Sequence, residues 1–173
     1  ALFGDYNPGG RLAVTFPKSV GQIPFAFPFK PGSDESSETS VYGALYPFGH
    51  GLSYTTFQYS DLVISPSKQG VQGNISISCT IKNIGQREGD EVVQLYLRDE
   101  VSSVTTYTQV LRGFERITLK PEASHTVHFE LTPQELGIWD KQMNFTVEPG
   151  MFKVMIGSSS KDIRLKGEFE IAQ

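Results

Sequence analysis

The chain lacks the features that mark membrane, nucleic-acid-binding or disulfide-rich proteins. It has one cysteine, Cys79, so no internal disulfide can form. No apolar run approaches the roughly 20 residues of a membrane span. The first ten residues have neither the basic start nor the apolar segment of a signal peptide. The net charge of −4 comes without a basic cluster, which argues against a nucleic-acid partner, because phosphate binding needs a basic face.

From Phe57 onward, the sequence consists of short segments in which apolar and polar residues alternate. The clearest are 75–82, 93–98, 127–131, 152–156 and 162–171. Alternation with a period of two is typical of strands that have one buried face. About seven such strands with tight turns predict an all-β fold, a two-sheet antiparallel sandwich of the immunoglobulin or fibronectin type III-like kind. The Cys–Trp–Cys spacing of true immunoglobulin domains is absent, which favours the fibronectin type III-like form.

Two local irregularities are expected within this sandwich. The alternation slips at Ser60 and Asp61, which predicts a β-bulge in the first strand. Thr132, Pro133 and Glu135 form a helix-start signature, and Gly137 ends the helix after one turn.

The front of the chain has a different character. Leu12, Val14 and Phe16 alternate with polar or small residues, which predicts a short strand that Pro17 ends. Residues 30–41 are small and polar, as in a mobile loop. The front segment has too few elements for a core of its own, and the opening residues from Ala1 read like the interior of a longer protein.

Residues 45–56 (LYPFGHGLSYTT) are rich in both glycine and aromatics. Glycine and proline exclude a regular helix or strand here, yet the aromatics contribute favourably only when buried. We therefore interpret the segment as a junction wedged between two bodies. The expected interface side chains are Tyr46, Phe48, His50, Leu52 and Tyr54.

Several motifs, in order, resemble the C-terminal end of glycoside hydrolase family 3, the family of many β-glucosidases and β-xylosidases. Residues 2–17 (LFGDYNPGGRLAVTFP) resemble the end of that family's α/β sandwich domain, and 45–57 (LYPFGHGLSYTTF) its link into a fibronectin type III-like domain. Residues 88–99, 111–121 and 147–160 match that last domain. The resemblance implies a tail of the α/β sandwich domain with linker over residues 1–44, and the junction with the β-sandwich over 45–173.

The resemblance also implies a division of labour. In this family the nucleophilic Asp lies in an N-terminal barrel, and the acid/base residue is also upstream, so no catalytic residue carries over to this chain. The expected partners are the missing N-terminal catalytic domains of the same polypeptide. The parent enzyme would hydrolyse terminal β-linked glucose or xylose with retention, without a cofactor, in a periplasmic or secreted location. Residues 25–32 depart from the family, which often has an Asn and a His there.

The acidic residues and histidines of this chain are candidates for sites of their own. A retaining glycosidase needs two carboxyl groups about 5 Å apart in a cleft. The candidate clusters are Asp34, Glu35 and Glu38, and Glu88, Asp90 and Glu91, and both are expected to be solvated surface. His125 and His128 are three apart on a strand and therefore point to opposite faces, and His50 has no neighbour in sequence, so no metal site is expected.

Aromatic side chains leave one alternative function open. Trp139, Tyr107 and Tyr96 could stack against sugar rings, which would make the chain an autonomous carbohydrate-binding module with an oligosaccharide as partner. Packing of these rings within the sandwich or between domains is the other interpretation.

Overall fold

The computed structural model describes residues 1–23, 25–32 and 43–173. Most of the expected loop 30–41, with Asp34, Glu35 and Glu38, lies outside the described residues.

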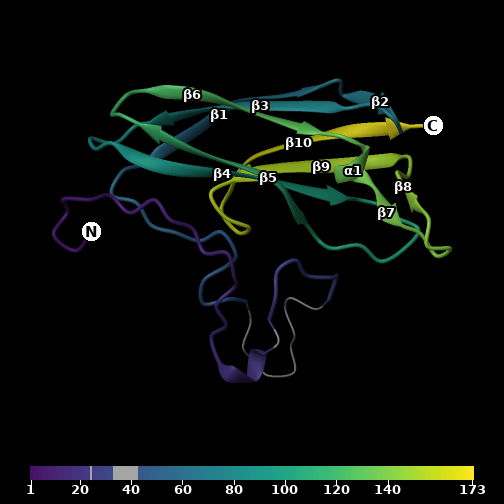
Figure 1. Cartoon of the computed structure of the whole chain (residues 1–173), viewed down its shortest axis with the longest axis horizontal. Helices are drawn as coiled ribbons and strands as arrows, with labels where there is room; N and C mark the ends of the chain where they lie inside the picture. The colour runs from purple at the N-terminus through teal and green to yellow at the C-terminus, as the bar shows by residue number, and fades with distance from the viewer. Residues whose placement is uncertain (24, 33–42) are drawn as a thin grey trace.

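Two packed sheets form the body of the molecule (Figure 1). The first sheet is antiparallel, with the strand order β1 (Phe57–Ser65), β3 (Ile75–Asn83), β6 (Ser124–Leu131). The second has the order β2 (Lys68–Gly70), β10 (Ile163–Ala172), β9 (Gly150–Gly157), β4 (Gly89–Asp99), β5 (Val110–Leu119). Its pairs are antiparallel except for β2 with β10, which is parallel. The predicted sandwich is confirmed.

The alternating apolar residues meet between the two sheets. Ile75, Ile77, Cys79 and Ile81 of β3 are fully buried, and the rings of Phe152 and Phe169 stack with centroids 5.4 Å apart. Burying one such side chain stabilises the fold by about 1.5–3 kcal/mol relative to exposure. The period-two pattern therefore works here as a one-sided burial pattern.

Both local irregularities occur where the sequence places them. The register between β1 and β3 shifts between Ser60 and Val63, and Asp61 has a positive φ of 53°. The short helix α1 (Pro133–Leu136) starts at Thr132, whose backbone N–H donates to the Glu135 carboxylate over 2.8 Å. It leads into a small hairpin of β7 (Ile138–Trp139) and β8 (Phe145–Thr146).

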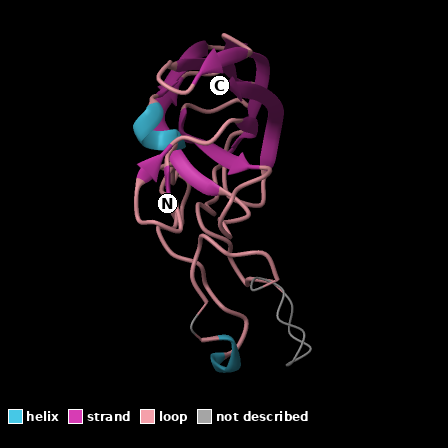
Figure 2. Ribbon diagram, turned by 90° about the vertical axis from the view of Figure 1, so that its right-hand side faces the viewer, coloured by secondary structure: helices cyan, strands magenta, loops and turns pink. Residues whose placement is uncertain are grey.

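The described residues of 1–56 form an arm that covers part of the five-stranded sheet and then extends away from the sandwich (Figure 2). Its regular element is the single turn η1 (Val20–Gln22). The strand predicted over residues 12–16 is wrong, because only Phe16 forms a bridge, with Tyr46. A strand needs hydrogen-bonded neighbours along its whole length. In the described arm, residues 12 and 16 form backbone hydrogen bonds to a single segment, residues 45–50.

Candidate functional site

The aromatic junction joins the arm to the sandwich through stacked rings. Phe48 stacks on Phe27 with centroids 4.6 Å apart, and Phe27 meets the ring of Tyr96 on β4 edge-on at 5.7 Å. As a result, β4 is covered on its outer face as well as its core face. Tyr96 is fully buried, so it offers no face to a sugar, and its assignment as a stacking residue is wrong.

A buried glutamine fixes the junction backbone. Gln94 of β4 donates from Nε2 to the carbonyls of Ser158 at 2.6 Å and Gly49 at 3.3 Å, and its Oε1 accepts from the Tyr96 hydroxyl. Gly49 has φ of 82°, and a Cβ added there would lie 2.1 Å from Gln94 Oε1. Only glycine suits both the conformation and the close approach.

A buried ion pair makes a second attachment. Arg11 Nη2 lies 2.5 Å from Glu91 Oε1, and the two side chains are 11% and 4% exposed. Burial raises the pKa of Glu91, and the Arg11 guanidinium opposes that rise. The expectation of a solvated Glu91 is wrong, since an arm residue 80 positions away covers it.

The neighbouring Asp90 has a separate set of partners. It accepts from Thr118 Oγ1 at 2.7 Å and from the Arg116 guanidinium. These hydrogen bonds, Thr118 first, lower the pKa of Asp90. Because adjacent strand residues point to opposite faces, Asp90 and Glu91 do not converge on one cleft.

The five predicted interface residues divide into two groups. Phe48 faces the sandwich, and His50 is half-buried with its ring 5.0 Å from that of Tyr46. Tyr46, Leu52 and Tyr54 remain 44%, 72% and 51% exposed. More than half of the exposed large apolar side chains in the described residues belong to the arm, and Leu2, Phe3, Val20 and Ile23 are at least two-thirds exposed.

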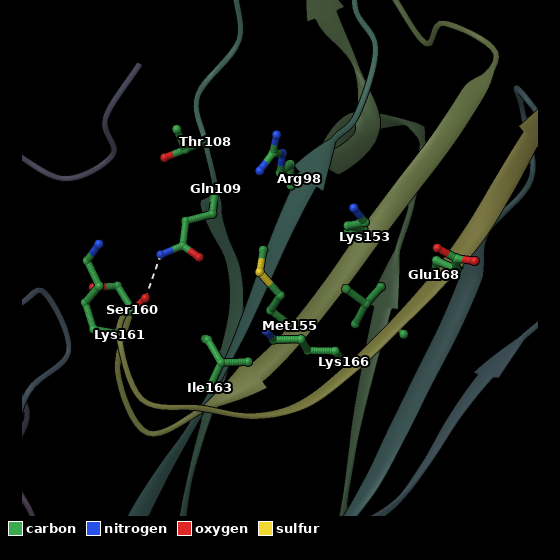
Figure 3. A pocket seen from close by; sticks show the side chains of 12 residues that line it. Arg98, Thr108, Gln109, Lys153, Met155, Ser160, Lys161, Ile163, Lys166 and Glu168 are labelled. Atoms are coloured by element: carbon green, nitrogen blue, oxygen red, sulfur yellow. Dashed lines mark hydrogen bonds between the residues drawn. The ribbon is translucent and has the colours of Figure 1, made fainter. Parts of the chain in front are cut away.

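A broad groove crosses the outer face of β9 and β10 (Figure 3). Its volume is about 900 Å³, and its charged lining residues are four cations, Arg98, Lys153, Lys161 and Lys166, and one acid, Glu168. Glu100 engages two of these cations, Arg98 at 3.0 Å and Lys153 at 2.8 Å. The groove is therefore a partly neutralised surface.

A smaller pocket of about 280 Å³ lies at the end of the sandwich, between residues 104–107 and the turn from α1 into β7. Trp139 and Tyr107, both predicted as stacking residues, line it together. Asp99 and Arg112 also line it, and the sequence analysis missed both. In the sequence, Asp99 resembles an ordinary turn residue. Nothing in the sequence distinguishes Arg112 from other residues of a strand.

Neither a metal centre nor a spanning helix emerges from the described ranges. No three His, Cys, Asp or Glu side chains in them gather closely enough to hold a metal ion. Likewise, no helix there has the length and apolarity to cross a membrane.

A two-sheet sandwich of short antiparallel strands, preceded by an extended aromatic arm, defines the class as a fibronectin type III-like domain. Residues 91–160 match the family model described as "Fibronectin type III-like domain", and residues 1–54 match "Glycosyl hydrolase family 3 C-terminal domain". The chain belongs to glycoside hydrolase family 3, of which it carries the C-terminal region.

Related proteins agree with this assignment. The chain is 43% identical, over 98% of its length, to the periplasmic β-glucosidase of Salmonella typhimurium, and 43% identical, over 95%, to a β-xylosidase of Formosa agariphila. It covers 24% and 23% of those proteins. A β-glucosidase structure from Erythrobacter marinus matches with a TM-score of 0.92 and 38% identity over 99% of this chain and 23% of that one. One from Listeria innocua matches at 0.89 and 31%, over 99% and 25%. The chain thus spans about a quarter of the length of these relatives.

Proposed function

We propose that this region is a non-catalytic brace that docks the exposed apolar side of its arm onto preceding domains of the same polypeptide. Residues 1–44 would complete an α/β sandwich domain, and residues 45–173 would form the junction and the accessory sandwich. Tyr46, Leu52 and Tyr54 would contact the preceding domains, while Phe48 and His50 would support them from the sandwich side.

The observation that carries this proposal is the two-sided junction. One side is closed on the sandwich by Phe48, Gln94 and the Arg11–Glu91 pair. Elsewhere the arm exposes large apolar side chains, among them Tyr46, Leu52 and Tyr54, and clustered exposed apolar side chains often mark an interaction surface. Relatives about four times as long supply a candidate for the covering body.

The activity of the whole protein is proposed from the named relatives. Two of them are a β-glucosidase and a β-xylosidase, which favours hydrolysis of terminal β-linked glucose or xylose by carboxylates outside these residues. One is named as periplasmic, which favours a periplasmic or secreted location.

The docking is tested in the full-length enzyme with Leu52→Asp and the control Val63→Asp. Both side chains are more than half exposed in this chain, but Val63 lies on β1 of the sandwich. We expect Leu52→Asp to lower the thermal unfolding midpoint by several degrees, because a charge would be buried at the interface. Equal midpoints for the two variants would refute the docking.

The non-catalytic role is tested separately on the 173-residue chain with 4-nitrophenyl β-glucoside and β-xyloside. We expect no turnover. Turnover that disappears when one Asp or Glu of this chain is replaced by its amide would overturn the proposal.

A further inference from the structure

We propose that the pocket lined by Trp139, Tyr107, Arg112 and Asp99 binds one pyranose ring of a neutral oligosaccharide. Binding of a sugar here goes beyond the bracing role. The pocket's volume of about 280 Å³ is just below the range of roughly 300–1,000 Å³ for small-molecule sites. The pocket therefore suits a single sugar unit, with the other units of the oligosaccharide in solvent.

Two aromatic side chains give the pocket its apolar surface. Trp139 is 59% exposed and Tyr107 is 43% exposed, so both rings are accessible. Phe145, opposite Trp139 in the β7–β8 pair, holds the indole from the side with centroids 5.5 Å apart. An accessible ring held by a neighbour loses little conformational freedom when a sugar's C–H groups pack on it.

The backbone beneath the rings is adapted to this arrangement. A Cβ added at Gly137 would lie 2.3 Å from Phe145 Cζ. Gly137 therefore lets Phe145 approach closely and support Trp139.

A β-bulge delivers Arg112 to the pocket. Leu95 pairs with Gly113 and Tyr96 with Leu111, so Arg112 is the additional residue on β5. Bulges of this kind redirect a side chain. Arg112 Nε is buried, and no described residue accepts a hydrogen bond from it. Leaving a buried donor unpaired is unfavourable, and a sugar hydroxyl is a suitable acceptor.

Asp99 supplies the complementary acceptor. Its Oδ1 accepts from the Val101 backbone N–H at 3.2 Å. Burial raises the pKa of this carboxyl group, and the same desolvation lowers the pKa of Arg112. A sugar hydroxyl both donates and accepts, so vicinal hydroxyls could pair with Asp99 and Arg112 together.

The cationic groove of Figure 3 is a weaker candidate for a neutral sugar. The groove has no aromatic side chain in its lining, and two of its four cations already contact Glu100. Its chemistry would favour an acidic ligand, which makes a uronic acid a useful comparison.

Trp139 is the sole tryptophan of the chain, so intrinsic fluorescence reports directly on this pocket. The chain is titrated with cellobiose, xylobiose, glucuronic acid and sorbitol. We expect a saturable change with cellobiose or xylobiose at roughly millimolar affinity. Sorbitol has no ring to stack and should produce no saturation.

Variants locate the site. Tyr107→Ala and Arg112→Met should each weaken binding by about tenfold or more, whereas Phe114→Ala, a 68% exposed aromatic on β5 outside this pocket, should bind normally. Tyr107 lies in a loop, so Tyr107→Ala keeps the test valid even if Arg112→Met fails to fold.

Three results would overturn the proposal: no saturation with either disaccharide, saturation by glucuronic acid alone, or equal affinity in Tyr107→Ala and Phe114→Ala.

Discussion

Arg11 and Glu91, 80 positions apart in the sequence, form a buried ion pair with 2.5 Å between Nη2 and Oε1. It connects the arm to the beginning of strand β4, and Val92 N–H donates to the same carboxylate oxygen at 3.0 Å. Arm and sandwich are therefore coupled through a charged contact as well as through the aromatic junction.

Breaking this pair should be strongly destabilising. Arg11→Met leaves Glu91 buried without its counter-ion, and we expect the free energy of unfolding to fall by about 3–5 kcal/mol in urea denaturation. The double variant Arg11→Met/Glu91→Leu should recover much of that loss. As a control, Lys68→Met breaks the Lys68–Glu170 pair, whose side chains are 61% and 43% exposed, and should change stability by at most about 1 kcal/mol. A loss for Arg11→Met no larger than for Lys68→Met would contradict the buried contact.

Gly49→Ala should destabilise the junction. The new methyl carbon would lie 2.1 Å from Gln94 Oε1, far inside van der Waals contact, and the backbone has a positive φ. We expect a loss of about 2–4 kcal/mol in urea denaturation. Gly10→Ala is the matched control, since a Cβ there has no neighbour within 4 Å, and its effect should stay within about 0.5 kcal/mol. Similar results for both variants would show that Gln94 does not pack under the junction.

Acid should remove the contribution of Asp90. Hydrogen bonds from Thr118 and Arg116 hold the folded-state pKa of Asp90 below its ordinary value of 3.8. A lowered carboxyl pKa stabilises the fold fully above the unfolded-state pKa, and this stabilisation is lost as pH falls through the folded-state pKa. Urea denaturation should therefore show wild type more stable than Asp90→Asn at neutral pH, with the difference shrinking below about pH 4.

Thr118→Val provides the matching comparison for Asp90. It keeps the carboxylate but removes the hydrogen bond that lowers its pKa most. With the folded-state pKa of Asp90 closer to its ordinary value, Thr118→Val should be less stable than wild type at neutral pH and should lose less stability on acidification. An acid-induced loss as large as in wild type would argue against this hydrogen bond.

Cys79 should be unreactive in the native protein. It is fully buried, and burial raises the pKa of its thiol to about 11. A disulfide reagent such as DTNB should label it only after urea unfolding, because the thiolate is the reactive form. In a Cys79→Ala background, Lys166→Cys places an exposed thiol on β10 and should react at once. Rapid labelling of native Cys79 would mean that the sandwich core opens readily.

Local sequence signals predicted the sandwich well. The alternation through Ile75–Asn83, the slip at Ser60 and Asp61 and the capping box at Thr132 each involve residues close together in the chain. Such signals follow from side-chain periodicity and local hydrogen bonding, which need no knowledge of distant segments.

The candidate sites were predicted less completely. For Trp139 and Tyr107 the sequence left two interpretations open, packing within the sandwich or between domains and stacking against a sugar, and the pocket that they share depends on a loop and a hairpin from different parts of the chain. The environment of Tyr96 was misjudged, because a polar-side position on a strand is normally solvated unless another segment covers it.

The sequence by itself determined the strand pattern, the sandwich class and the aromatic character of the junction, since these follow from the order of residue types. Only the tertiary structure decided that Arg11 covers Glu91, that Phe27 covers Tyr96 and that a bulge turns Arg112 toward Trp139. Each of these depends on which distant segments come into contact, and that is set by the packing of the whole chain rather than by any local preference.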